Sequence, residues 1–245
     1  MRDIHWLFTI PIAHRGFYSS SIPENSILAF REAIKNGYNI ELDIRKTKDD
    51  VLVVFHDNNL TRLTSLDKTI EDSLYSEIND LRLNKTEEKI PTFMEVLDCV
   101  RGQVGILIEI KEHTEIGRLE ELLSCILDTY DGKFAIQSFN PFIIRWFFIN
   151  RSHYIRGQLF GGFKKNGKSL LQQYSEKTLF LNIISRPDFI TYEFEFLNTW
   201  IQFLARISRT PILVWTIRDP VDAKKAEILA QNLIFEGFHY TRNRE

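Results

Sequence analysis

Apolar runs alternate with amphipathic stretches along the whole chain, and this alternation predicts strands separated by helices. Nine mainly apolar runs are interpreted as strands: Phe8–Ala13, Asn39–Arg45, Val51–His56, Val104–Lys111, Phe134–Phe139, Tyr154–Phe160, Asp188–Phe194, Pro211–Ile217 and Asn232–Phe235. Most of the intervening segments carry apolar residues at helical spacing. Short strand–helix–strand connections of this kind favour a parallel sheet, either closed or doubly wound.

The first predicted helix follows the segment Pro23-Glu24-Asn25-Ser26. Either Asn25 or Ser26 has the side chain of a helix cap, and Gly37 is suited to end the helix. Pro23 and Glu24 are interpreted as helix entry and local hydrogen bonding rather than as reacting groups.

Nine strands are one more than an eight-stranded barrel needs. Only a few residues separate the second and third predicted strands, whereas a parallel crossover needs about a dozen. These two strands are therefore expected to form an antiparallel hairpin with Asp49-Asp50 as a two-residue loop, which places Asp43 opposite His56. The chain is predicted to be an α/β protein, a (βα)8 TIM barrel with an extra hairpin strand after the second barrel strand. At 245 residues, residues 1–245 are expected to form a single domain.

Composition narrows the possible partners and the setting. Hydrophobic residues make up 44% of the chain, enough for a substantial core, and the net charge of −2 gives no general attraction to nucleic acid or to an anionic membrane. No apolar run approaches the roughly 18 residues of a membrane span, and no cleavable leader is expected before the first strand. Cys99 and Cys125 lack metal-ligand spacing, so they are expected to be buried thiols in a reducing compartment. The expected location is cytoplasmic.

Three carboxylates stand out against the predicted strands. Glu41 and Asp43 are two residues apart, so both side chains point to one face of their strand, and Glu109 follows the apolar residues of another strand. Carboxylates facing a barrel interior are costly unless a cation or hydrogen bonds compensate. Three of them suit Ca²⁺ or Mg²⁺, which prefer oxygen ligands. The alternative is that they form salt bridges with Arg45 and Lys111.

Two histidines and two cations complete a set of reactive groups. His14 and His56 each lie at the end of a predicted strand, and a pair of imidazoles can act as general base and general acid. The residues alone do not assign the two roles. Arg15 and Lys111 are the candidate phosphate-binding cations, the first as a planar fork and the second as a point charge. The set is suited to metal-assisted cleavage of a phosphodiester.

The later strands add weaker candidates. Trp215 and Phe139 lie at the ends of two of these later strands. They are expected either to line the substrate pocket or to pack in the core. The lysine-rich stretch Phe160–Lys168 is interpreted as a solvated loop. The remaining histidines, interpreted as structural or solvent-facing, are His5, His113, His153 and His239.

Six short segments, taken in order, resemble the glycerophosphodiester phosphodiesterase family. They are Ala13-His14-Arg15-Gly16, Pro23-Glu24-Asn25-Ser26, Glu41-Leu42-Asp43, Thr47-Lys48-Asp49-Asp50, Phe55-His56-Asp57 and Glu109-Ile110-Lys111. The resemblance implies a barrel that hydrolyses small glycerophosphodiesters to glycerol 3-phosphate and an alcohol with a divalent cation. It also implies His14 and His56 as the catalytic pair, Arg15 beside the phosphate, and carboxylate ligands for the metal at Glu41, Asp43 and Glu109.

The chain departs from the family pattern at a few positions. Asp50 occupies the place of a usual hairpin glycine, and Arg218 stands where the family typically has Asn. No large insertion follows His56, although residues 58–90 could form a small cap.

Two alternative functions stay open. A phospholipase-like relative would use an internal hydroxyl as nucleophile and leave a cyclic phosphate. The aromatic stretch Phe142–Phe148 could be cited for lipid contact, but its apolar residues on nearly all sides are more typical of a buried helix. A binding module that has lost turnover would also keep the barrel, but every expected chemical group is present.

Overall fold

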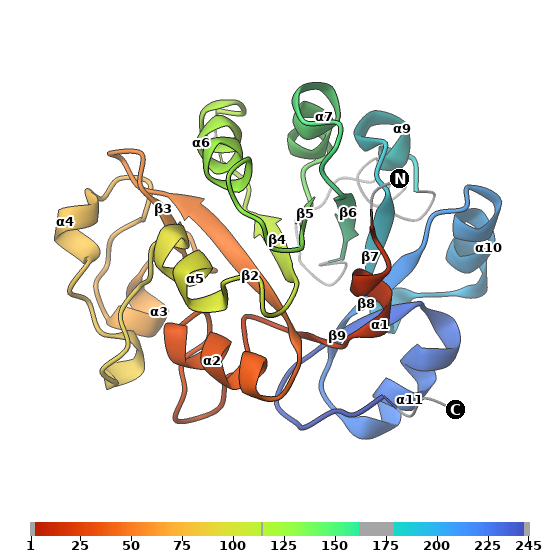
Figure 1. The fold of residues 1–245 in the computed structure, drawn as a ribbon, viewed down its shortest axis with the longest axis horizontal. Coiled ribbons are helices and arrows are strands. Elements are labelled where there is room, and N and C mark those ends of the chain that lie inside the picture. Colours follow the sequence, from red (N-terminus) through yellow and green to blue (C-terminus); the bar gives the residue numbers. More distant parts are fainter. Residues whose placement is uncertain (1–2, 114, 162–178, 243–245) are drawn as a thin grey trace. The chain divides into compact units, whose positions relative to one another are not determined.

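The computed structural model describes residues 3–113, 115–161 and 179–242. Their strands join in one nine-stranded sheet of order β1-β9-β8-β7-β6-β5-β4-β2-β3, and a further pairing of β1 with β2 closes eight of them into a ring. The fold is a TIM barrel with one extra strand, β3, bonded outside the ring (Figure 1), as predicted. The chain divides into two compact units, Ala13–Phe134 and Met1–Ile12 with Ala135–Glu245.

The unit Ala13–Phe134 contains the first half of the strand–helix alternation. Its elements are α2 (Ile27–Lys35), β2 (Asn39–Lys46), β3 (Leu52–Val54), α3 (Thr61–Thr64), α4 (Tyr75–Ile78), the 3₁₀ helix η1 (Leu83–Lys85), α5 (Phe93–Val100), β4 (Ile106–Ile110) and α6 (Arg118–Leu127). Strands β2 and β4 run parallel, in a register that sets Asp43 opposite Glu109. Ser26, rather than Asn25, caps α2, because its hydroxyl accepts a hydrogen bond from the Ala29 amide.

The second unit continues the same alternation. Its elements are α1 (Trp6–Thr9), α7 (Pro141–Asn150), β6 (Arg156–Phe160), α9 (Leu181–Ser185), β7 (Phe189–Glu193), the 3₁₀ helix η2 (Phe194–Phe196), α10 (Thr199–Ile207), β8 (Ile212–Ile217), α11 (Pro220–Leu229) and β9 (Asn232–Phe235). Strands β1 (Ile12–Ala13) and β5 (Phe134–Ser138) lie at the boundaries of the two units. Strands β5 to β9 pair in sequence order and in parallel.

The start of the chain differs from the prediction of a strand over Phe8–Ala13. Residues Trp6–Thr9 form the short helix α1, and the strand is only Ile12–Ala13. The amide of Asn232 donates to the carbonyls of Leu7 and Ile10, at 2.9 and 2.7 Å, and so binds backbone groups that a strand would use for its ladder. A short apolar run does not distinguish a strand from a buried helical turn, which explains the error.

The hairpin of β2 and β3 is antiparallel, as predicted, but its register is not the predicted one. Arg45 pairs with Val53, and the Phe55 amide donates to the Asp43 carbonyl at 2.9 Å, so Phe55 rather than His56 lies opposite Asp43. The loop has three residues, 48–50, because Thr47 pairs with Val51 through a 2.9 Å backbone hydrogen bond. Its last residue, Asp50, has φ +64°, the left-handed conformation that three-residue hairpin loops require.

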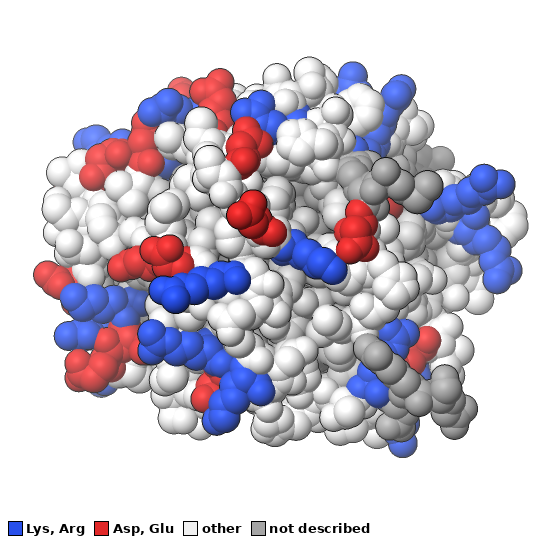
Figure 2. Space-filling model, in the orientation of Figure 1, with Lys and Arg blue, Asp and Glu red and all other residues white. Residues whose placement is uncertain are grey.

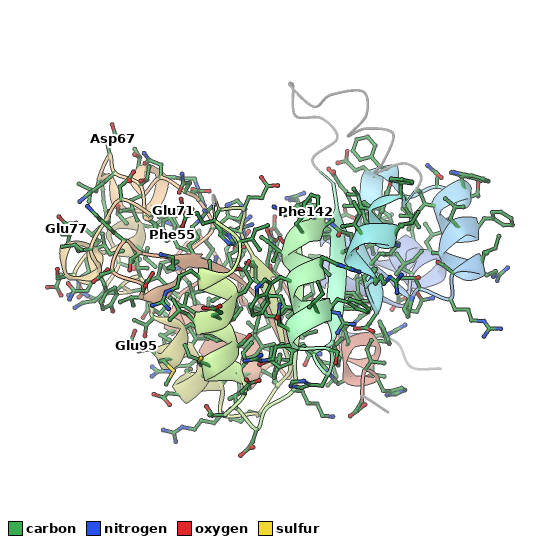
Figure 3. All side chains as sticks on the ribbon, turned by 90° about the horizontal axis from the view of Figure 1, so that it is seen from above. Phe55, Asp67, Glu71, Glu77, Glu95 and Phe142 are labelled. Carbon is green, nitrogen blue, oxygen red and sulfur yellow. The ribbon has the colours of Figure 1, made fainter. Side chains whose placement is uncertain are left out.

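Between β3 and α5 the chain forms a folded insert, residues 57–91. It contains α3, α4 and η1 and has an apolar core shared with the end of the hairpin. The buried members of this core are Val53, Phe55, Leu60, Leu63, Ile70, Ile78, Leu83 and Ile90. In Figure 3, Asp67 and Glu77 lie at the outer margin of the insert and Phe55 lies beside the strands. Residues 58–90, which could form a small cap, thus belong to a folded segment.

Two smaller expectations are resolved by side-chain exposure. Cys99 and Cys125 are free thiols, but they are not buried: Cys99 is half-buried and Cys125 exposed. Helix α7 is not a buried helix either, because Phe142 is 58% exposed at its first turn (Figure 3). Of the loop predicted over Phe160–Lys168, residues 162–168 lie outside the described range.

Surface charge and helix length add two observations. Acidic and basic side chains are intermingled on the face that Figure 2 presents. Among the helices that the structure describes, none has both the length and the apolar character needed to cross a bilayer.

Candidate active site

Three buried carboxylates meet at neighbouring strands of the unit Ala13–Phe134. Glu41 and Asp43 lie on β2 and Glu109 lies on β4, and each of them offers an oxygen within 4.8 Å of the others. Their exposed fractions are 1%, 0% and 6%. The predicted carboxylate cluster therefore exists, and the parallel register of β2 and β4 brings it together.

The electrostatics of the cluster favour an added cation. Burial, together with the negative charges of Asp43 and Glu109, raises the pKa of Glu41 well above its ordinary value. Burial also raises the pKa of Glu109. Oxygen Oε1 of Glu41 is buried without a hydrogen-bond partner among the described residues. An all-carboxylate oxygen set with an unsatisfied ligand atom fits a hard divalent cation such as Ca²⁺ or Mg²⁺.

Lys111 and Arg15 already neutralise part of this charge. Lys111 is 2.8 Å from Asp43 through Nζ and also contacts Glu109, while Nε of Arg15 is 3.5 Å from Asp43. Burial would raise the pKa of Asp43, but these two cations lower it far below its usual range. The alternative of salt bridges thus holds for Lys111. Arg45, by contrast, makes no ion pair with any described residue and donates only to the His56 carbonyl, at 3.0 Å.

A tight turn after β1 brings His14 and Arg15 to the carboxylates. Arg15 has φ +55° and Gly16 φ +79°, and the Arg15 amide donates to Oε2 of Glu41 at 3.0 Å. Nε2 of His14 lies 4.0 Å from the same oxygen. A Cβ on Gly16 would approach the Ala29 backbone to 2.9 Å, so both the conformation and the space call for glycine here.

His56 follows the hairpin and is held by the next residue. Its Nδ1 is 2.7 Å from Oδ1 of Asp57, which fixes the plane of the ring and leaves Nε2 for other partners. Burial lowers the pKa of His56 to about 4, with Lys111 and Arg15 adding to the effect and Asp43 opposing it. The imidazole is therefore neutral at neutral pH and able to accept a proton.

Four site residues were not identified as such from the sequence. Asn25, in the left-handed region at φ +55°, donates to Oδ2 of Asp43 at 2.8 Å. Glu24 accepts from Arg15 at 2.6 Å and from both terminal nitrogens of Arg62 at 2.9 and 2.7 Å. Arg62 also donates to Asp57. The available signal was that Glu24, Asn25 and Asp57 lie within the short segments that carry the family resemblance.

Two further residues considered in the sequence analysis, His113 and Trp215, have contacts of their own. His113 hydrogen-bonds the Lys111 carbonyl at 2.9 Å and pairs with the buried Glu120 at 3.2 Å, which supports its interpretation as structural. Trp215 lies in the second unit, where its indole donates to the Phe160 carbonyl at 3.0 Å and packs edge-on against Phe139. A role of Trp215 in substrate binding stays a prediction.

The fold and this group of side chains define a TIM-barrel protein of the phosphodiesterase type. The chain belongs to the glycerophosphoryl diester phosphodiesterase family, whose sequence profile matches residues 14–235.

Individual relatives agree with this assignment. A glycerophosphodiester phosphodiesterase of Caldanaerobacter subterraneus is 35% identical over 149 residues, which cover 56% of this chain and 60% of that protein. A structure of the same name from Thermotoga maritima is 29% identical with a TM-score of 0.69, covering 92% of this chain and 93% of its own. A phosphodiesterase of Oleispira antarctica, solved with its product sn-glycerol-3-phosphate, has a TM-score of 0.77 at 21% identity, covers 94% of each chain, and shows likeness of fold.

Proposed function

We propose that this protein hydrolyses glycerophosphodiesters to glycerol 3-phosphate and an alcohol with the help of a divalent cation. The observation that carries the proposal is one cluster of complementary groups within a single compact unit. The buried carboxylates Glu41, Asp43 and Glu109 are flanked by Arg15 and Lys111 and by His14 and His56. Family membership and the names of the relatives support the same substrate class.

The three carboxylates are the proposed metal ligands. A divalent cation held by them would supply positive charge to the phosphate of the substrate. The positive charges of Arg15 and Lys111 are proposed to bind the remaining phosphate oxygens and to stabilise the charge that develops on them. The guanidinium of Arg15 is pre-oriented by Glu24, so it is in position before substrate binds.

Proton transfer is assigned to His14 and His56. One imidazole takes a proton from the attacking water as its oxygen bonds to phosphorus. The other gives a proton to the alcohol oxygen as the bond from phosphorus to that oxygen breaks. The neutral state of His56 suits acceptance of a proton. We leave the two roles unassigned, since Nε2 of His14 also lies near the carboxylates, 4.0 Å from Oε2 of Glu41.

A coupled assay for glycerol 3-phosphate, run with Ca²⁺, Mg²⁺ or chelator on several head groups, tests the proposal. We expect release that depends on the metal and falls by at least about a hundredfold in H14A and H56A, in the range expected when a general acid or base is lost. The exposed His153 gives a matched control, because H153Q should retain wild-type turnover. Equal release with metal and with chelator would contradict the proposal, and a cyclic phosphate product seen by phosphorus NMR would favour the phospholipase-like alternative.

A further inference from the structure

We propose that Arg62 of the insert is a positioning residue for this reaction: its guanidinium holds Asp57, which orients His56, and Glu24, which orients Arg15. The inference rests on the proposed function. It concerns a residue outside the groups assigned above to phosphate, metal and proton transfer.

The contacts form one continuous chain of hydrogen bonds. Arg62 donates through Nε to Oδ2 of Asp57, whose Oδ1 holds Nδ1 of His56 at 2.7 Å. The terminal nitrogens of Arg62 donate to both oxygens of Glu24, at 2.9 and 2.7 Å. Oε1 of Glu24 also accepts from Nη1 of Arg15 at 2.6 Å. A single side chain therefore contacts the partners of two proposed reacting groups that are 41 positions apart in the sequence, at 15 and 56.

Only an arginine has the donor geometry for this position. The planar fork presents Nε to one carboxylate and both terminal nitrogens to the other, whereas a lysine ammonium reaches both only as a point charge. Burial would raise the pKa of Asp57 and of Glu24, but the hydrogen bonds from Arg62 lower both. Each carboxylate is therefore ionised and is a strong acceptor for its second partner.

The insert fixes the backbone from which Arg62 reaches. Arg62 lies on the short helix α3, and its neighbours Leu60 and Leu63 are 0% and 5% exposed in the core of the insert. The Arg62 side chain itself is 46% exposed. The pair with Asp57 is partly exposed, and the buried Glu24 keeps its ion pair with Arg15 when Arg62 is removed, so the expected loss of folding stability is small. The main effect of Arg62 is therefore expected on the geometry of the site rather than on the stability of the fold.

Arg82 provides a matched control within the same insert. Its side chain is also 46% exposed and pairs with a carboxylate, Glu87, at 3.4 Å. Glu87 is 95% exposed, and its backbone carbonyl also accepts from Arg82. Removing Arg82 therefore deletes an equivalent surface charge without touching the chain of hydrogen bonds.

The experiment compares wild type with R62A, R62K and R82A. In the assay of glycerol 3-phosphate release, we expect the kcat of R62A to be about tenfold lower than that of wild type, because a group that orients a reacting side chain is lost. We expect KM to change less than kcat. R62K should recover part of the loss, and added guanidinium should restore R62A but not affect R82A. Circular dichroism measures the folded fraction of each variant, by which kcat is corrected.

A second readout does not depend on turnover. The ¹⁵N-bonded ring proton of His56, assigned by its loss in H56A, reports the hydrogen bond to Asp57. We expect it to shift or exchange faster in R62A and to stay unchanged in R82A. A wild-type kcat and an unshifted His56 signal in R62A would overturn the inference. If wild type itself releases no product, the proposed function fails, while the His56 signal still decides the inference.

Discussion

At the scale of single residues, the surroundings of His56 make its protonation a property of the folded state. The ring is half-buried near Lys111 and Arg15, and its pKa is lowered to about 4 from an ordinary value of 6.5. Between these two values the unfolded chain binds a proton that the folded protein does not. Stability contributed by neutral His56 is therefore complete above the unfolded pKa and is lost as the pH falls from 6.5 towards 4.

We expect H56Q to remove this part of the acid sensitivity. In urea unfolding with chelator present, lowering the pH from about 7 to about 5 should reduce the free energy of unfolding of wild type more than that of H56Q. The expected difference is on the order of 1 kcal/mol. Equal losses in the two proteins would show that burial does not lower the pKa of His56.

At this scale, the sequence can propose a candidate site residue when the position of that residue in a predicted strand is enough to select it. His14, His56, Glu109 and Lys111 are candidates because they lie at or near strand ends. Glu41 and Asp43 are candidates because their two-residue spacing puts both side chains on one face of a strand. The contact of Arg62 with Glu24 joins residues 38 positions apart, and no periodicity relates the two positions. Such a contact is set by how the insert folds, so the sequence pattern carried no signal for it.

At the scale of elements, the hairpin between β2 and β3 depends on the conformation of one loop residue. Asp50 has φ +64° and pairs with Lys46 at 2.6 Å and with Arg118 at 2.7 Å. The sequence correctly indicated a hairpin, because the connection is too short for a crossover. It gave the wrong loop length, because neighbouring acidic residues do not reveal which of them takes the left-handed conformation.

Substitutions at Asp50 separate backbone strain from ion pairing. D50A and D50G both delete the two ion pairs, but only alanine is disfavoured at positive φ. We expect D50A to be less stable than D50G by about 1 kcal/mol in equilibrium unfolding. D50N, which tolerates the left-handed region, should fall between them. Equal stability of D50A and D50G would mean that the loop relaxes to another conformation.

At the scale of the whole molecule, the buried carboxylates predict that metal binding and folding are linked. The folded protein gathers Glu41, Asp43 and Glu109 within 4.8 Å, whereas the unfolded chain does not. A cation that binds the folded state stabilises it by about 2.7 kcal/mol at a hundredfold excess over its dissociation constant. Because the pKa of Glu41 is raised, the cation competes with a proton there, and its affinity should increase with pH.

Unfolding in a titration with Ca²⁺ or Mg²⁺ checks this linkage. The free energy of unfolding of wild type should increase with metal concentration, and that of E41Q should increase much less. In chelator, E41Q should be more stable than wild type, because it removes one of three crowded charges. The exposed Glu112 supplies the control, as E112Q should respond like wild type. A metal response of E41Q equal to that of wild type would exclude Glu41 as a ligand.

The barrel itself was predictable from the order of apolar runs, because each parallel strand needs a crossover and most crossovers here are amphipathic. The extent of the first strand was not predictable, because the side-chain amide of Asn232, near the other end of the chain, donates to the carbonyls of Leu7 and Ile10 at α1. The fold of the insert was not predictable either, because its core is formed by eight buried residues spread along the chain from Val53 to Ile90.

The register of the hairpin constrains how this protein can change in evolution. Phe55 packs into the core of the insert while the next residue, His56, faces the carboxylates. Deleting one residue from the loop 48–50 would exchange these two orientations, presenting phenylalanine to the site and histidine to an apolar core. Lineages of this chain should therefore tolerate many substitutions in the loop but not a change of its length by one residue.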